Sequence, residues 1–148
     1  MQPSNFANIL KSLLDTLGCR AVIFDLDGTL IDNNAYHLKA WLSYLERAGI
    51  HVTEEEYRKN FNGRTNKDVI EHIFQRPMTE EESMKYALEK EALYREIYAP
   101  HIKPVDGLLS LLETLDQLSI PMAIATSGIQ VNIDFMFDHL PVKQYFKA

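Results

Sequence analysis

The sequence lacks most features of secreted, membrane-spanning and nucleic-acid-binding proteins. It has a single cysteine, Cys19, among 148 residues, so the chain cannot form an internal disulfide. This cysteine usage is typical of a reducing compartment, and we expect a cytoplasmic protein. No apolar run approaches the roughly 20 residues of a membrane-spanning helix, and the first ten residues carry no cationic stretch of a secretory signal. We therefore expect no membrane partner.

Cationic residues are also in short supply. The chain has 15 lysines and arginines against 21 aspartates and glutamates, which gives a net charge of −6, and the cations form no basic stripe. This balance argues against a nucleic-acid partner, because such proteins need a concentrated positive surface. A small anionic substrate is compatible with it, provided that the site supplies local positive charge or a metal ion.

The residues that are present follow a globular pattern, with 46% hydrophobic and 24% charged residues. Apolar residues from Phe6 to Leu17 recur at helical spacing, which predicts an amphipathic helix in segment 1–19 that ends at Gly18. The polar side of this helix has few cations. We therefore expect its apolar side to pack against the domain rather than on a membrane surface.

Two short apolar runs, at 21–24 and 120–126, have the character of buried parallel strands. A helical pattern over 107–118 leads into the second of them. This order of strand, helix and strand predicts an α/β fold with a partial Rossmann-like core, made of residues 20–33 and 100–148.

The core is interrupted by a long helical segment, 34–99, which we interpret as a cap subdomain. Two of its helices begin with the spacing of a capping box, in which a threonine and a glutamate three residues later bond to each other's backbone. The two pairs are Thr53 with Glu56 and Thr79 with Glu82.

The segment Asp25-Leu-Asp-Gly-Thr-Leu30, which follows the first strand, is the most informative in the chain. Ligands of open α/β sheets bind at the carboxyl ends of the strands, so both carboxylates converge on a binding position. Such a pair can hold a hard cation and leave an oxygen to attack phosphorus. Gly28 permits the sharp turn that brings backbone amides towards an anion.

These residues resemble the first motif of the haloacid dehalogenase superfamily, Asp-x-Asp-Gly-Thr/Val. The resemblance implies that Asp25 is a nucleophile that becomes phosphorylated and that Asp27 is the general acid and base. It also implies a Mg²⁺ ion held at Asp25 and Asp27.

Thr126, at the end of the second strand, resembles the second motif of that superfamily, a hydroxyl residue that binds the transferring phosphoryl group. With the backbone N–H of Ser127 it would stabilise charge on the phosphoryl oxygens. A threonine in this position is also a common helix cap, which is the structural alternative.

The cap sequence resembles the caps of the beta-phosphoglucomutase group and related sugar-phosphate phosphatases. The resemblance covers the segments Tyr36–Trp41 and Asn62–Asp68. It suggests that His37, Arg64 and Lys67 contact the substrate, while we expect Trp41 to lie in the core of the cap. The guanidinium of Arg64 suits a bidentate contact with phosphate or sugar oxygens.

Members of the superfamily continue beyond the matching segment with further strand–helix units. Those units hold a lysine and an acidic pair that complete the phosphoryl and magnesium sites, so the resemblance implies a further C-terminal half as a partner of this chain. The last residues, from Gln144, resemble the approach to a third core strand. The outer edge of the first strand would be left bare.

The resemblance thus implies a magnesium-dependent phosphatase that acts on a small phosphorylated metabolite, in particular a sugar phosphate. A mutase of the beta-phosphoglucomutase kind is a first alternative, supported by His37 and Trp41. A catalytically inactive remnant or interaction module is a second, because the lysine and the acidic pair are not in this sequence. By itself, segment 1–148 is expected to be inactive.

Overall fold

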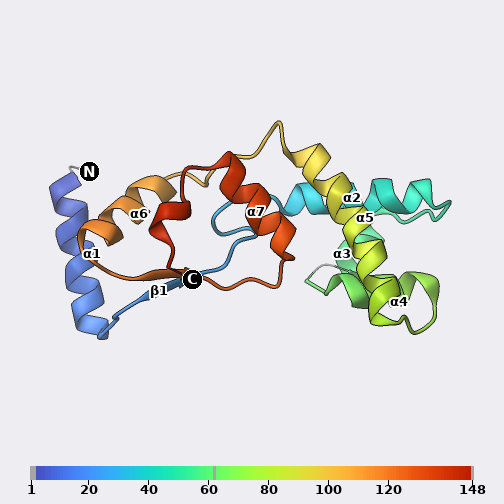
Figure 1. Cartoon of the computed structure of the whole chain (residues 1–148), viewed down its shortest axis with the longest axis horizontal. Helices are drawn as coiled ribbons and strands as arrows, with labels where there is room; N and C mark the ends of the chain where they lie inside the picture. The colour runs from blue at the N-terminus through green and yellow to red at the C-terminus, as the bar shows by residue number, and fades with distance from the viewer. Residues whose placement is uncertain (1–2, 62, 148) are drawn as a thin grey trace. The chain divides into compact units, whose positions relative to one another are not determined.

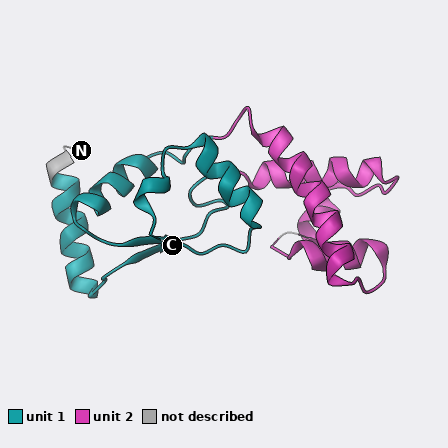
Figure 2. Cartoon of the chain, viewed as in Figure 1, with its two compact units in different colours: residues 1–32, 103–148 teal, residues 33–102 magenta. Residues whose placement is uncertain are grey.

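The computed structural model describes residues 3–61 and 63–147. They form two compact units, which Figure 2 shows in different colours. Unit 1 comprises residues 1–32 and 103–148, and unit 2 comprises residues 33–102. The sequence analysis placed the corresponding boundaries at residues 34 and 99.

Unit 1 contains the two strands of a parallel sheet together with the helices that flank them in sequence (Figure 1). Strand β1 (Val22–Phe24) pairs with β2 (Met122–Ile124), with Val22 opposite Met122 and Phe24 opposite Ile124. Helix α6 (Leu108–Gln117) precedes β2, and α7 (Gln130–His139) and the short 3₁₀ helix η1 (Lys143–Tyr145) follow it. The α/β class that the sequence predicts is therefore confirmed.

Near residue 146 the chain begins to pair with β2, in the position of a third strand. Phe146 bridges Met122 in parallel, and the Lys147 N–H donates to the Met122 carbonyl at 2.9 Å. Within residues 3–61 and 63–147 no strand pairs with the other edge of β1. The middle residue of β1, Ile23, is 68% exposed. Both the approach to a third strand and the bare edge of β1 agree with the sequence analysis.

Helix α1 (Pro3–Leu17) forms where the apolar spacing predicts it and ends before Gly18. Its apolar side is covered only in part. Leu14 is buried, but Ile9, Leu13 and Leu17 are more than half exposed. The expectation that this side packs against the domain is therefore wrong for these three residues.

Unit 2 is made of helices in the part of it that the structure describes. They are α2 (Asn34–Arg47), α3 (Glu54–Asn60), α4 (Asn66–Phe74) and α5 (Glu80–Tyr98). Both predicted capping boxes form, at the start of α3 and at the start of α5. Such caps arise from residues close in sequence, which is why their spacing alone identifies them.

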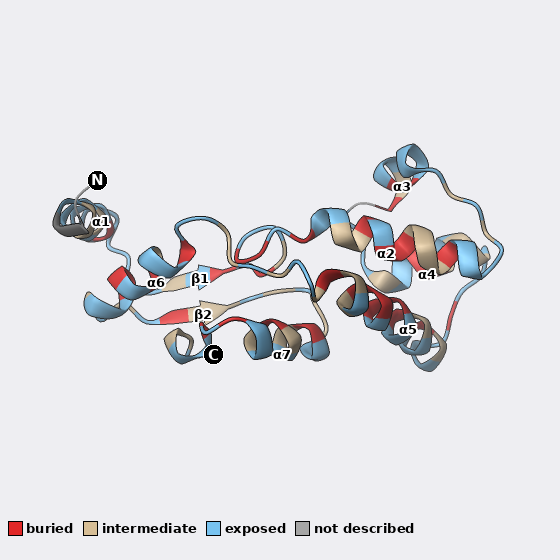
Figure 3. Ribbon diagram, turned by 90° about the horizontal axis from the view of Figure 1, so that it is seen from above, coloured by how far each residue is buried: buried red, intermediate tan, exposed pale blue. Residues whose placement is uncertain are grey.

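Unit 2 is held together by an apolar cluster among its helices (Figure 3). Trp41 and Leu45 come from α2, and Val69 and Ile70 come from α4. All four are at most 3% exposed. The prediction that Trp41 lies in the core of the helical segment is confirmed. Among the described residues, no helix is long and apolar enough to cross a bilayer.

Candidate functional site

The loop after β1 places two carboxylates at the carboxyl end of the sheet. Asp25 follows the last residue of β1 and is exposed, and its Oδ1 accepts a hydrogen bond of 2.7 Å from the Leu26 N–H. Asp27 is half-buried. The chain then turns sharply, because the Gly28 N–H donates to the Ile31 carbonyl at 2.8 Å. Gly28 has a φ of 72°, a left-handed conformation that glycine adopts without steric cost.

Thr126 lies at the same end of the sheet. The Ala125 N–H donates to the Phe24 carbonyl at 2.9 Å, which continues the strand pairing just past the ends of β1 and β2. Because parallel strands end at a common edge, the residues that follow them, Asp25 and Thr126, are brought together.

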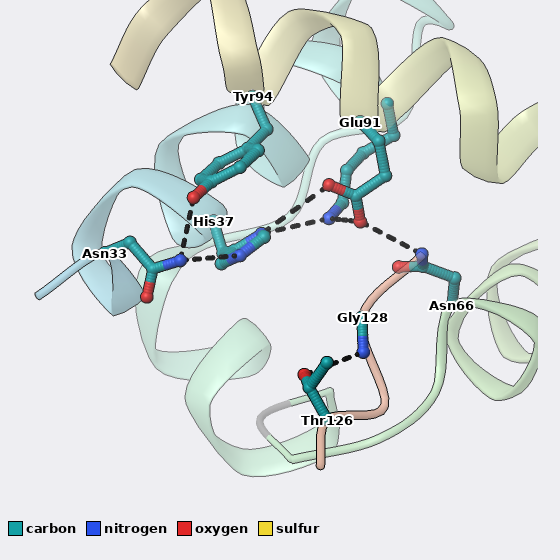
Figure 4. Close-up of polar contacts among 8 residues, drawn as sticks. Asn33, His37, Asn66, Glu91, Tyr94, Thr126 and Gly128 are labelled. Atoms are coloured by element: carbon teal, nitrogen blue, oxygen red, sulfur yellow. Dashed lines mark hydrogen bonds and ion pairs between the residues drawn. The ribbon is translucent and has the colours of Figure 1, made fainter. Parts of the chain in front are cut away.

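The hydroxyl of Thr126 does not cap the following helix. The Thr126 Oγ1 accepts a hydrogen bond of 3.0 Å from the Gly128 N–H, whereas the N-cap position of α7 is Ile129 (Figure 4). Thr126 is therefore not the N-cap residue of α7. Ser127 is exposed in the same turn.

Gly128 keeps the space between Thr126 and Asp27 open. A Cβ atom at this position would lie 3.3 Å from Thr126 Oγ1 and 3.7 Å from Asp27 Oδ2. The two side chains therefore approach the same small volume, and a larger residue at 128 would fill it. Sequence analysis assigned no role to Gly128.

The donors at this edge suit a hard cation. Asp25 and Asp27 offer carboxylate oxygens, and Mg²⁺ is commonly bound by one or two carboxylates together with substrate phosphate oxygens. Within residues 3–61 and 63–147 there is no group of three or more acidic, histidine or cysteine side chains that could hold a metal ion. Asp25 and Asp27 are thus two carboxylates at the end of the sheet, and not a complete set of metal ligands.

The residues that the sequence predicts to contact the substrate lie in unit 2. Arg64 and Lys67 are exposed on either side of the start of α4, whereas His37 on α2 is half-buried. Asn62, which the sequence analysis included in the same loop, lies outside the described residues.

His37 belongs to a buried polar network (Figure 4). Its ring stacks on Tyr94 with the centroids 3.9 Å apart, and its Nε2 lies 3.3 Å from the Asn33 amide nitrogen. Asn33 is fully buried, and its Nδ2 donates to the Tyr94 hydroxyl at 2.7 Å. The Lys90 Nζ lies 3.2 Å from His37 Nδ1. This network orients the imidazole from two helices.

Sequence analysis missed the charged members of this network, Lys90 and Glu91. Both are almost fully buried on α5, and they form an ion pair of 2.6 Å. A signal was available. Lys90 falls at the helical spacing of the buried residues Ala87 and Tyr94, in a position where an apolar side chain is the usual choice.

Comparison with known proteins places this geometry in a family. A family model described as "Haloacid dehalogenase-like hydrolase" matches residues 22–148. The chain is 38% identical, with a TM-score of 0.79, to the crystal structure of a HAD hydrolase of family IA, variant 3, from Entamoeba histolytica, covering 86% of this chain and 58% of that one.

Two curated relatives are named as phosphatases. One is validoxylamine A 7'-phosphate phosphatase of Streptomyces hygroscopicus subsp. limoneus, 30% identical over 74% of this chain and 50% of the relative. The other is 6-phosphogluconate phosphatase of Escherichia coli, 25% identical over 85% of this chain and 56% of the relative. The chain thus spans little more than half the length of these proteins. The match over residues 22–148 shows that the chain belongs to the haloacid dehalogenase-like hydrolases.

Proposed function

We propose that the protein is a magnesium-dependent phosphatase that cleaves a small sugar phosphate through an aspartyl-phosphate. The observation that carries the proposal is that Asp27 and Thr126 meet beside Gly128 at the end of the β1–β2 pair, where Asp25 directly follows β1. A nucleophile, a proton carrier and a hydroxyl donor within one small volume are the groups that phosphoryl transfer needs.

In the first step, a carboxylate oxygen of Asp25 attacks the phosphorus, and the bond from phosphorus to the sugar oxygen breaks. Asp27 gives its proton to the departing sugar oxygen. In the second step, Asp27 takes a proton from a water molecule whose oxygen attacks the phosphorus. Inorganic phosphate leaves, and the Asp25 carboxylate is regenerated.

Thr126 and the Ser127 backbone would hold the phosphoryl oxygens during both steps. Charge develops on these oxygens in the transition state, so fixed donors aimed at them lower the barrier. The Thr126 hydroxyl can donate to a phosphoryl oxygen while its own oxygen still accepts from the Gly128 N–H.

Asp25, through its carboxylate, and Asp27, through its backbone carbonyl, are the residues of this chain that would hold magnesium, which leaves the Asp27 carboxyl available for proton transfer. When bound, the ion neutralises negative charge on the phosphoryl group and the Asp25 carboxylate. With Asp27 protonated, the Asp25 carboxylate and a phosphate dianion together carry about three negative charges, and like charges 4 Å apart repel by about 4 kcal/mol at an effective dielectric of 20.

We assign the substrate class from the relatives and from unit 2. The relatives are named for phosphorylated small molecules, one of them a sugar acid phosphate. In the proposal, unit 2 is the cap, and His37, Arg64 and Lys67 contact the part of the substrate beyond the phosphate. The exposed, hydrogen-bonding side chains of Arg64 and Lys67 fit a hydroxyl-rich group.

We also propose that catalysis needs a further segment of protein that completes the charge balance around the phosphoryl group. The support is that the chain spans 50% to 58% of the length of its relatives. Segment 1–148 expressed by itself should then show no magnesium-dependent turnover, and a companion segment added in trans should restore it. A cytoplasmic location is part of the proposal and is in keeping with the single cysteine.

The decisive experiment measures phosphate release by the full-length protein with magnesium, over a panel of sugar phosphates and p-nitrophenyl phosphate. We expect turnover of about 1 s⁻¹ or faster for at least one sugar phosphate. Isomerisation of glucose 1-phosphate primed with a bisphosphate, without net phosphate release, would instead identify the mutase. No turnover of either kind would favour the non-catalytic alternative.

A further inference from the structure

The interior of unit 2 holds an ion pair that the proposed chemistry does not use. Lys90 is 1% exposed and Glu91 is 4% exposed, and the Lys90 Nζ donates to Glu91 Oε1 at 2.6 Å. A charge inside a protein is tolerated only when another group compensates it. Because the positive charge of Lys90 is balanced inside the unit, this lysine is not a free cation for a substrate phosphate.

Glu91 also reaches the start of the neighbouring helix α4. The Asn66 Nδ2 donates to Glu91 Oε1 at 3.0 Å, and Asn66 is the first residue of α4 (Figure 4). Arg64 lies two residues before it, in the loop from Gly63 to Thr65. The hydrogen bond therefore fixes one end of the loop that carries Arg64.

The cap of α4 cannot fix this loop against α5. Thr65 Oγ1 accepts from the Asp68 N–H at 3.2 Å and donates to Asp68 Oδ2 at 2.7 Å. Both bonds lie within the loop and the first turn of α4, so they shape the helix end and leave its orientation undetermined. The contact from Asn66 to Glu91 supplies a link between the two helices.

The same carboxylate lies near the second predicted substrate contact. Glu91 Oε2 is 3.9 Å from His37 Nδ1, on α2. One buried side chain on α5 thus adjoins both the imidazole of His37 and, through Asn66, the loop of Arg64. We propose that Glu91 is a positioning residue, which holds the loop 63–66 so that Arg64 contacts the substrate. This inference rests on the proposed function only in its last step.

The test must separate positioning from charge balance. Glu91→Leu leaves Lys90 buried without its carboxylate and should lower the melting temperature by about 10 °C or more. The double variant Lys90→Met/Glu91→Leu removes both charges and should recover most of that loss. It still lacks the acceptor for Asn66. Glu91→Gln keeps an acceptor oxygen, and Glu96→Gln, exposed on the same helix, is the matched control.

Two measurements on the full-length variants report on the order of the loop 63–66 and on its contact with the substrate. In the stable double variant, amide hydrogen exchange of residues 63–68 should be about tenfold faster, whereas exchange in the capping box at 53–56 should not change. The KM for a sugar phosphate should rise about tenfold, with kcat/KM for p-nitrophenyl phosphate within about twofold of the native value. Glu91→Gln should have nearly native hydrogen exchange and a nearly native KM, and Glu96→Gln should change neither quantity.

Unchanged exchange at 63–68 in the double variant would overturn the inference, because Glu91 would then be only the charge partner of Lys90. Faster exchange with an unchanged KM would overturn it as well, because the loop would not carry a substrate contact. If the native protein cleaves no sugar phosphate, the proposed function fails, and the exchange measurement still decides whether Glu91 holds the loop.

Discussion

Unit 1 and unit 2 bury their side chains in different ways. In unit 2, apolar residues from several helices close over one another, and the polar groups inside are paired. In unit 1, the middle of β1 exposes Ile23, and three leucine or isoleucine side chains of α1 face solvent. The candidate catalytic groups Asp25 and Thr126 lie in the less enclosed unit.

Fold stability and the candidate chemistry therefore depend on different residues of the chain. Unit 2 contains the elements that local sequence rules specify best, such as its two capping boxes. Unit 1 contains two strands of three residues each, which are marginal without further pairing. Substitutions should therefore affect activity or stability according to the unit in which they fall.

The largest effect is expected in unit 1. Asp25→Asn in the full-length protein should lower kcat by at least about 10³-fold, because the nucleophilic carboxylate is lost. The exposed position of Asp25 predicts little change in the melting temperature. Phosphate release and thermal unfolding are measured together, with Asp116→Asn on the exposed side of α6 as the control. Substantial phosphatase activity in Asp25→Asn would remove Asp25 from the mechanism.

The next effect is on stability and belongs to unit 2. Ile70→Ala should cost about 2–5 kcal/mol, because Ile70 is fully buried in the apolar cluster. Ile23→Thr in segment 1–148 should change stability by less than about 0.5 kcal/mol, because Ile23 is 68% exposed. Urea unfolding of both variants measures the two costs. If both variants lose a similar free energy of unfolding, the contrast between the buried residues of unit 2 and the exposed β1 is contradicted. A larger loss for Ile23→Thr in the full-length protein than in segment 1–148 would indicate that a further segment covers β1.

The sequence predicted the features that depend on near neighbours. The capping boxes at Thr53 and Thr79, the turn at Gly28 and the strand-end position of Thr126 all follow from residues a few positions apart. Others arise only when distant segments are assembled. Asn66 and Glu91 are 25 residues apart in sequence, so no local pattern indicates their hydrogen bond.

The role of Gly128 could not be predicted for the same reason. A glycine that follows a strand is usually explained by the turn itself, and Gly128 has no left-handed φ. Its importance comes from Asp27, a side chain about 100 residues earlier in the chain that lies beside it in the fold.

Two glycines offer a test in which the units respond in opposite ways. Gly128→Ala should lower kcat/KM by about 20-fold, because its Cβ would lie 3.3 Å from Thr126 Oγ1 and shift that oxygen by a few tenths of an ångström from the phosphoryl position. Gly49→Ala, where φ is 74° and no atom lies near the added Cβ, should cost about 1 kcal/mol of stability without a change in kcat. Activity and urea unfolding are measured for both. An active Gly128→Ala variant would show that the space is not used.

A smaller effect is expected at the proposed substrate contact in unit 2. Arg64→Ala should raise the KM for a sugar phosphate about tenfold and leave p-nitrophenyl phosphate within about twofold, since only the larger substrate reaches beyond the phosphate. Lys59→Ala, exposed on α3, serves as the control. An equal rise in KM for both substrates would indicate that Arg64 contacts the phosphoryl group and not the sugar.

The smallest effect concerns the acid sensitivity of unit 2. The hydrogen bond from the Arg76 guanidinium, together with the Thr79 N–H, lowers the pKa of Glu82 to about 2. In the unfolded chain the pKa of a glutamate is about 4.3. Because the folded pKa is the lower one, the stabilisation is complete above about pH 5 and is lost as the pH falls towards 2.

Glu82→Gln should therefore destabilise the start of α5 near pH 6, and the difference from the native protein should shrink steadily between pH 5 and pH 2. Urea unfolding of segment 1–148 across this range measures it, with Glu56→Gln in the other capping box as the comparison. The pKa of Glu56 is also lowered, by hydrogen bonds from Thr53, but that box has no arginine partner. A difference for Glu82→Gln that stays constant down to pH 2 would show that the pair with Arg76 does not set the acid limit of unit 2.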